Sequence, residues 1–230
     1  MSDGKLYLVR HGETASNAAG LWQGRHGDDP LNERGREQSL AVAEALADSG
    51  ATALYASDLR RAAETAGFIG ARLGLPVQSH AGLREYGFGD MEGATTAEAL
   101  ARWKTLLRQW RTDPSAKPPG GESAVEFTMR VGAALQEIVD RHQDETVIVV
   151  AHGGSLSVGL AVLVGEPGNW QDYQMTNCGI SIVDMGPDRK ILTFDQTSHL
   201  AGIGVTAWAG VDVRPDEPPE SLELGPESTE

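Results

Sequence analysis

The sequence has a single cysteine and no long hydrophobic run, and each absence excludes a class of protein. Cys178 has no second cysteine to pair with, which rules out an internal disulfide framework and a cysteine-based zinc site. A transmembrane helix needs about 18 consecutive apolar residues, and the sequence contains no such run. Residues 1–5 lead straight into an apolar segment with no signal peptide, so we expect a cytoplasmic protein without membrane association.

Basic residues are also scarce. There are 19 lysines and arginines against 33 aspartates and glutamates, and the formal net charge is −14. Residues 212–230 hold −6 of this charge, and residues 206–230 are acidic and proline-rich, so we expect a separate C-terminal tail after a domain at residues 1–205. Such acidity argues against a nucleic-acid partner. Any phosphate-binding site must therefore be a local basic pocket.

Short apolar runs alternate with segments that carry helix-capping signals. The runs predict strands at 5–9, 53–56, 77–79 and 146–151, and a hairpin at 180–184 and 190–195. Cap residues such as Asn32, Thr95 and Ser123 predict helices at 33–48, 58–73, 95–111, 123–142 and 155–164. The alternation predicts an α/β fold, a three-layer α/β/α sandwich with a mostly parallel central sheet and an antiparallel edge.

Side chains that can bind phosphate or take part in catalysis follow the predicted parallel strands. Arg10 and His11 come directly after the first strand, Arg61 and Glu85 lie shortly after the second and third, and His152 follows the fourth. Ligands of such sheets bind at the carboxyl ends of the strands, so we expect these groups to meet. The arginine fork suits phosphate, and histidine can carry a covalent phosphoryl group. The pattern predicts phosphoryl transfer through a phosphohistidine.

Three alternatives remain open at this point. In the first alternative, Arg10 and His11 have a structural role only and are hydrogen-bonded to the backbone at a strand end. Arg60 competes with Arg61 as the phosphate ligand, and Asp90 and Glu92 compete with Glu85 as the acid.

The motifs, taken together, resemble the histidine phosphatase superfamily, which includes cofactor-dependent phosphoglycerate mutases and many small-molecule phosphatases. The resemblance covers about residues 5–200 and is carried by Arg10-His11-Gly12-Glu13-Thr14 with Asn17, Gln23-Gly24, Leu31-Asn32-Glu33-Arg34-Gly35, Ser57-x-Leu59-x-Arg61-Ala62-x-x-Thr65, Leu83-Arg84-Glu85-Tyr86-Gly87-Phe88-Gly89, Gly120-Gly121-Glu122-Ser123 and Ala151-His152-Gly153-Gly154.

The resemblance implies a role for each matching residue. His11 is the nucleophile that becomes phosphorylated, and Glu85 is the general acid and then the base for incoming water. Arg10, Arg61 and His152 surround the phosphoryl group. Further phosphate or substrate contacts come from Asn17, Gln23, Gly24 and Gly153. No metal or other cofactor is implied, because two arginines can supply the charge neutralisation that the transfer needs.

Two features favour the phosphatase branch over a mutase. Mutases of this superfamily carry a longer insertion with an adjacent arginine pair, whereas the corresponding region 95–123 is short here. Tyr86 follows Glu85 where mutases have a basic residue. We therefore expect a metal-independent phosphomonoesterase acting on a small phosphorylated metabolite, as a monomer or homodimer. A phosphoglycerate mutase, or a non-catalytic binding protein on the same fold, is the alternative.

Overall fold

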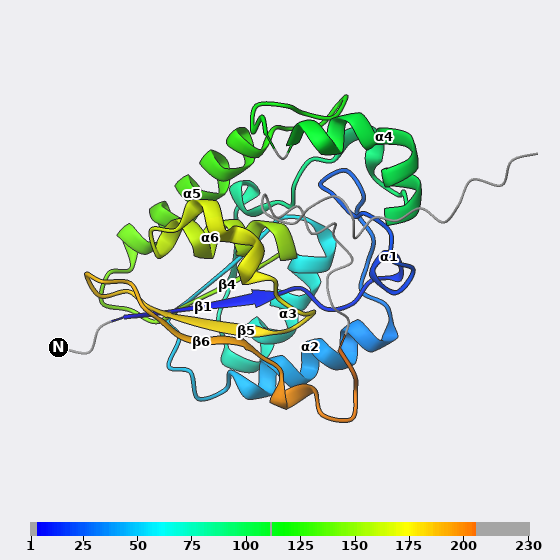
Figure 1. Ribbon diagram of the computed structural model, residues 1–230. Helices are drawn as coiled ribbons and strands as arrows, with labels where there is room; N and C mark the ends of the chain where they lie inside the picture. Colours follow the sequence, from blue (N-terminus) through cyan, green and yellow to red (C-terminus); the bar gives the residue numbers. More distant parts are fainter. Residues whose placement is uncertain (1–3, 111, 206–230) are drawn as a thin grey trace, which may run out of the picture.

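A six-stranded sheet forms the centre of the molecule (Figure 1), as seen in a computed structural model that describes residues 4–110 and 112–205. The strand order is β3-β2-β4-β1-β5-β6. Four strands are parallel, namely β1 (Lys5–Arg10), β2 (Ala53–Ala56), β3 (Val77–Ser79) and β4 (Val147–Ala151). The last two, β5 (Ile180–Asp184) and β6 (Ile191–Gln196), run antiparallel and complete one edge. The predicted fold class is confirmed.

Helices cover both faces of this sheet, because successive residues of the buried strands point to opposite sides. Leu8 and Val149 pack with residues of α5 (Ala124–Arg141) and α6 (Gly153–Leu163), which lie together above the strands in Figure 1. Val9 and Val150 pack with residues of α2 (Glu33–Ala45) and α3 (Arg60–Leu73) on the other face. The two cores hold β1 and β4, and hence their carboxyl ends, in fixed positions.

The capping signals at Asn32 and Ser123 predicted the starts of α2 and α5. The Asn32 side chain accepts the Gly35 N–H at the start of α2, and Ser123 with Glu126 forms a reciprocal capping box at the start of α5. Gly74 adopts a left-handed conformation, with φ 71°, where α3 ends. The predicted start of α6 at residue 155 is wrong by two residues, because the backbone of His152 already acts as the N-cap.

Two helical segments lie apart from the main layers. The short α1 (Ala15–Ala18) was not predicted. Helix α4 (Thr96–Trp110) is kinked at Trp103 and packs with Trp22 and Met91 in a third, smaller cluster. Short 3₁₀ segments complete the described structure at Ala81–Leu83, Gly89–Met91, Ser198–Leu200 and, with a kink at Asn169, at Pro167–Tyr173. Within 4–110 and 112–205, every helix is too short or too polar to cross a membrane. The predicted tail at 206–230 lies outside the described residues.

Two glycines should respond in opposite ways to the same substitution. A methyl group at Gly35 would overlap the backbone carbonyl oxygen of Glu13, so we expect Gly35→Ala to lower the free energy of unfolding by about 1–3 kcal/mol. Gly67 is exposed on α3 with open space around it, and Gly67→Ala should raise stability by about 0.5–1 kcal/mol. Urea denaturation of both variants checks this, and equal effects would contradict the close packing at Gly35.

Candidate active site

The structure brings the predicted residues together at the carboxyl edge of the parallel strands. Arg10 ends β1, His11 follows it, and His152 follows β4, the strand that pairs with β1. Arg61 lies in the first turn of α3, which follows β2. All four side chains are almost completely buried, with exposed fractions between 0 and 3%. Cationic groups and imidazoles so far from water need a specific reason to be there.

The contacts of His11 determine which ring nitrogen is free. Its Nδ1 lies 2.7 Å from the Gly12 carbonyl oxygen, which can only accept, so Nδ1 carries the proton. The Arg61 Nε–H donates to the other nitrogen, Nε2, at 3.3 Å. Burial and the nearby charges of Arg61 and Arg10 hold the pKa of His11 well below its usual value of 6.5. His11 is therefore a neutral imidazole whose unprotonated Nε2 can act as a nucleophile once the Arg61 N–H moves to a bound anion.

Backbone carbonyls hold the two arginines in place. Arg61 donates from Nη2 to Gly24 O and from Nη1 to Gly27 O, each at 2.9 Å. Arg10 donates from Nη1 to Met175 O at 2.8 Å, and its buried Nε has no hydrogen-bond partner in the described structure. Burial lowers the pKa of each guanidinium to about 10, so both remain charged at neutral pH. A donor that is charged, buried and unpaired favours binding of an anion.

The rival Arg60 has another role. Its side chain is half-exposed and forms an ion pair with Glu64 one helical turn away, at 2.7 Å. It has no contact with His11, which Arg61 contacts directly. The structure therefore favours Arg61 over Arg60 as the arginine of the site.

His152 lies beside His11, with 5.1 Å between the ring centroids. Its Nε2 is hydrogen-bonded to the Ser57 hydroxyl at 2.8 Å, whereas the buried Nδ1 has no partner among the residues described. Burial, followed by the charge of Arg61, holds the pKa of His152 well below 6.5. The ring is therefore neutral and has one unpartnered nitrogen, Nδ1, among the residues described.

The Glu85 carboxylate sits at the N-terminus of α6. One oxygen accepts the Gly154 N–H at 2.9 Å, and the other accepts the N–H groups of Ser155 and Tyr86 at 3.1 and 2.8 Å. These bonds favour the charged form, yet burial outweighs them and raises the pKa of Glu85 above its usual 4.5. A carboxyl group with a raised pKa is suited to donate and accept a proton near neutral pH.

The rival carboxylates lie elsewhere. Glu92 accepts the backbone N–H groups of Arg25, His26 and Gly27, and so holds the loop whose carbonyls bind Arg61. Asp90 is exposed. Glu85 is therefore the one of the three that the structure places against the α6 turn beside His152.

The remaining predicted residues lie in the loops around His11. Gln23 accepts the Thr14 hydroxyl through Oε1, and its buried Nε2 has no partner in the part of the chain that the structure describes. Asn17 accepts the Thr14 N–H at 3.2 Å. Gly24 contributes the carbonyl that holds Arg61, rather than a direct ligand group. Gly153 is the first residue of α6, where backbone N–H groups have no partner within the helix.

The sequence analysis missed Asn177, which bridges two parts of the site. Its side-chain Nδ2 donates to the backbone oxygen of His11 at 2.8 Å and lies 3.2 Å from Asn17 Oδ1. Its buried Oδ1 has no partner within 4–110 and 112–205. The signal for it was weak, since Asn177 precedes an antiparallel strand, and only the sheet order shows that β5 starts at the edge where β1 ends.

The sequence analysis also missed Arg130, which fixes the segment that carries Glu85. Arg130 donates to the carbonyl oxygens of Gly82, Arg84 and Glu85, and it pairs with the buried Glu122 at 2.5 Å. Glu122 in turn accepts the Gly87 N–H at 2.9 Å. The Gly120-Gly121-Glu122-Ser123 motif was noted in the sequence, but its partner on α5 was not.

No group of three or more His, Cys, Asp or Glu side chains in the described ranges is arranged to hold a metal ion. The donors that converge on the site are guanidinium, imidazole and amide groups, which suit an oxyanion such as phosphate.

The comparison with known families agrees with this geometry. The family model described as the histidine phosphatase superfamily (branch 1) matches residues 6–195. The chain belongs to the histidine phosphatase superfamily. The resemblance inferred from the motifs is therefore confirmed over nearly the whole of the described structure.

Relatives in this superfamily bear both phosphatase and mutase names. The chain is 38% identical to a glucosyl-3-phosphoglycerate phosphatase of Mycolicibacterium vanbaalenii, over 72% of this chain and 77% of the relative. It is 33% identical to a probable phosphoglycerate mutase of Citrobacter koseri, over 85% of this chain and 94% of the relative. A solved mycobacterial glucosyl-3-phosphoglycerate phosphatase in complex with VO3 has a TM-score of 0.75 and 33% identity, with 84% of this chain and all of that chain covered. The prediction of a phosphatase of this superfamily is confirmed, and the mutase alternative has less support.

Two arginine–carboxylate pairs should differ sharply in their contribution to the free energy of unfolding. Arg130 pairs with Glu122, which is 5% exposed, whereas Arg84 pairs with Asp58 near the surface at the same 2.5 Å distance. Removing Arg130 leaves a buried carboxylate without its main partner, so Arg130→Ala should cost about 3 kcal/mol in unfolding free energy. Arg84→Ala should cost less than about 1 kcal/mol. Chemical denaturation measures both, and similar losses would show that the Arg130 cluster is no more than a surface pair.

Proposed function

We propose that this protein hydrolyses a small phosphorylated metabolite through a phosphohistidine on His11, with no metal ion taking part. One observation carries the proposal, which is that the unprotonated Nε2 of a neutral His11 contacts the buried Arg61 guanidinium and that the charge of the buried Arg10 also acts on this imidazole. Such an arrangement combines a nucleophile with the charge that a phosphoryl group requires. A structural histidine at a strand end would need neither the second arginine nor the second imidazole.

The reaction follows from these positions in two steps. His11 Nε2 attacks phosphorus while the bond to the ester oxygen breaks, and Glu85 gives its proton to the departing alcohol oxygen. Glu85, now a carboxylate, then takes a proton from a water molecule that attacks the phosphohistidine. Phosphate leaves, and His11 and Glu85 return to their starting protonation states.

The surrounding donors would bind the equatorial oxygens during both steps. Arg10, with its unpaired Nε, and Arg61 supply the positive charge. Gln23 Nε2 and the Gly153 N–H add neutral donors, and His152 adds a polar nitrogen through Nδ1 or Nε2. Asn17 and Asn177 hold the loop from His11 to Asn17. Gly24 contributes indirectly, because its carbonyl oxygen accepts a hydrogen bond that holds the Arg61 guanidinium in place.

The names of the relatives support a small phosphoester of a sugar acid or a similar metabolite as the substrate. The residue that follows Glu85 argues against the mutase alternative. Tyr86 is buried and packs on Phe88 and Phe127, with ring centroids 4.9 and 4.8 Å away, so this position supplies no cation for a substrate carboxylate. The cytoplasmic location and the monomeric or dimeric state stay predictions.

Loss of the nucleophile should abolish turnover. We expect wild type to release phosphate from p-nitrophenyl phosphate between about pH 5 and 7.5 in the presence of a chelator, and His11→Ala to show less than about 0.1% of that rate. His142→Ala is the matched control, because His142 lies at the end of α5, where it bonds the Tyr55 hydroxyl and no residue of the site. This variant should keep full activity. Wild type that is denatured in SDS at alkaline pH during turnover should carry phosphate on His11, because acid would hydrolyse the N–P bond of a phosphohistidine. Conversion of 3-phosphoglycerate to 2-phosphoglycerate without net hydrolysis would instead establish the mutase.

The role of Glu85 should depend on the leaving group and on pH. Methoxide is a far stronger base than p-nitrophenolate, so Glu85→Ala should slow methyl phosphate hydrolysis about 10²–10⁴-fold and p-nitrophenyl phosphate hydrolysis much less. Because the pKa of Glu85 is raised and that of His11 is lowered, wild-type kcat/KM for methyl phosphate should hold at acidic pH and fall as pH rises through the Glu85 pKa. Equal losses with both esters, or no alkaline fall, would remove Glu85 as the acid.

A further inference from the structure

Asn177 lies shortly before β5, and its side chain is completely buried. The two protons of its amide nitrogen, Nδ2, are donated to the His11 backbone oxygen at 2.8 Å and to Asn17 Oδ1 at 3.2 Å. Its own oxygen, Oδ1, has no partner in the described structure, which is a cost that a residue serving only to fill space would not carry. Rotation of the amide would turn Oδ1 toward two acceptors, so the orientation of the Asn177 side chain is fixed.

The orientation of the Asn17 amide follows from these contacts. Asn17 Oδ1 accepts from Asn177 Nδ2 and also from the Thr14 backbone N–H at 3.2 Å, which is part of the capping box of α1. Both of these partners can only donate. A flipped Asn17 would place its own NH2 group against them, so its amide cannot turn. Asn17 Nδ2 therefore faces away from both partners, and within 4–110 and 112–205 it donates to no other residue.

The turn that carries Asn177 is held by contacts outside the loop that follows His11. Asp195 Oδ1, on β6, accepts the N–H and the hydroxyl of Thr176 at 2.9 and 3.0 Å. Gly179 permits this approach, because a Cβ there would overlap the Asp195 carboxylate. Cys178 has a φ of 55°, a left-handed conformation that residues other than glycine keep only where neighbouring contacts impose it. The Asn177 donor therefore has a fixed position to which the Asn17 amide adapts.

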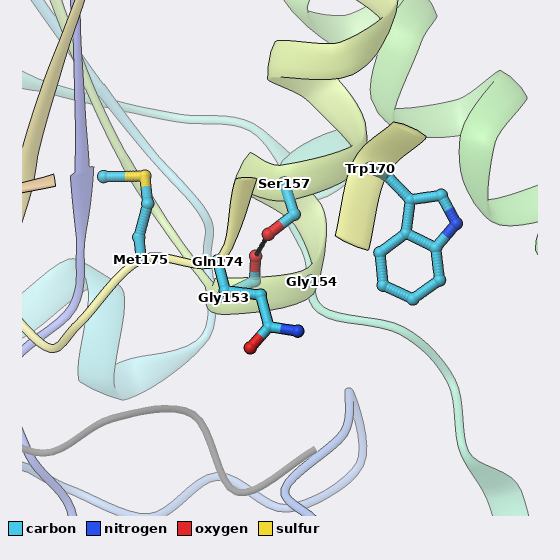
Figure 2. A pocket seen from close by; sticks show the side chains of 6 residues that line it. All are labelled: Gly153, Gly154, Ser157, Trp170, Gln174 and Met175. Atoms are coloured by element: carbon cyan, nitrogen blue, oxygen red, sulfur yellow. Dashed lines mark hydrogen bonds between the residues drawn. The ribbon is translucent and has the colours of Figure 1, made fainter. Parts of the chain in front are cut away.

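The segment that precedes this turn is held against α6. Figure 2 shows it at Met175, which lies beside Gly153 in the first turn of the helix. The Ser157 hydroxyl of α6 is bonded to the Tyr173 carbonyl of the same segment at 2.6 Å. The Met175 carbonyl in turn accepts the Arg10 guanidinium at 2.8 Å. One segment thus positions a cation of the site and, shortly after it, an amide donor.

We infer that Asn177 is a positioning residue that fixes the Asn17 amide with its NH2 group toward the bound phosphate. The inference rests on the proposed function, in which an anion binds beside His11. In this orientation Asn17 can only donate to an oxyanion, whereas the flipped amide would present its oxygen and repel one. The same Asn177 nitrogen holds the His11 backbone, so nucleophile and donor keep a fixed relative position. Both protons of Asn177 are engaged, so it acts on the reaction through these two residues.

A double-mutant cycle on the full chain tests this role. Asn177→Ala, Asn17→Ala and the double variant form the cycle. Each is measured twice, as the inhibition constant for inorganic phosphate and as kcat for p-nitrophenyl phosphate. Asn169→Ala is the matched control, because Asn169 is exposed on the 3₁₀ segment Pro167–Tyr173 and bonds no residue of the site.

The two measurements should separate the two contacts of Asn177. We expect Asn177→Ala and Asn17→Ala each to raise the inhibition constant for phosphate about tenfold, the usual effect of losing a hydrogen bond to a charged group. The double variant should bind phosphate at most about twofold more weakly than Asn17→Ala, since Asn177 acts on phosphate through Asn17. Its kcat should nevertheless be lower than that of Asn17→Ala, because the hold on the His11 backbone is lost as well. Asn169→Ala should match wild type in both measurements.

Asn177→Asp tests the direction of the Asn17 amide. Aspartate has nearly the same shape as asparagine but offers only acceptors, so Asn17 should turn its NH2 group toward it and its oxygen toward the anion. Phosphate should then bind about tenfold more weakly than in Asn177→Ala. Most of this difference should disappear when Asn17 is also replaced by alanine. A difference that persists without Asn17 is the effect of the added negative charge alone and contradicts the inference.

Additive losses of phosphate binding in the cycle would also overturn it, because residues that act independently lose their contributions separately. If Asn177→Ala does not fold, wild type provides the test. The side-chain ¹H–¹⁵N signals that are absent from Asn17→Ala should shift when inorganic phosphate is added, and unmoved signals contradict the inference. Additive losses with His11-dependent turnover leave the proposed function standing. Turnover that survives in His11→Ala removes the proposed function, and the phosphate titration still decides the orientation of Asn17.

Discussion

The burial of two guanidinium groups at the end of a parallel sheet is the constraint on which the rest of this structure depends. Arg10 and Arg61 are 2 and 0% exposed, and burial lowers the pKa of each to about 10. Glu85 exerts the largest opposing charge effect on both groups. Asp195 acts in the same direction on Arg10, and Asp28, Asp29 and Glu92 do so on Arg61, each with a smaller effect than Glu85. Bound phosphate would add negative charge beside both guanidinium groups and stabilise the fold as it binds.

Much of the surrounding structure keeps these charges in position. Carbonyl oxygens from two separate segments accept the arginine donors, and Glu92 fixes the loop that provides Gly24 and Gly27. Arg130 does the same for the segment that carries Glu85, with three hydrogen bonds to backbone carbonyls and two to Glu122. A group held by backbone contacts needs little reorganisation when a ligand arrives, which is the condition for strong electrostatic stabilisation.

Local sequence signals predicted the six strands, five of the α-helices and the site residues that follow parallel strands, but not the short α1. The run of β-branched residues predicted β4, and the cap residues predicted α2 and α5. The rule that ligands bind at the carboxyl ends of parallel strands placed His11 and His152 at one edge of the sheet. Periodicity carries no information about which strands are neighbours, so the order β3-β2-β4-β1-β5-β6 was out of reach. Asn177 and Arg130 were missed for the same reason, because each acts across elements that are distant in the sequence. The shift of α6 to Gly153 arises because His152 caps the helix through its backbone, which a search for side-chain caps does not detect.

The position of β1 within the sheet has a consequence for how the enzyme is made. This strand, which precedes the other five in the sequence, pairs on one side with β4 and on the other with β5, so that Tyr7 lies opposite both Ile148 and Ile182. Asn177, which holds the backbone of His11 in place, also lies late in the sequence relative to β1. A nascent chain therefore carries His11 long before the surrounding residues can fold around it. Ribosome-bound or truncated chains that stop before β5 will hold β1 with an unpaired edge, and the arrangement around His11 will form only once β5 has been synthesised.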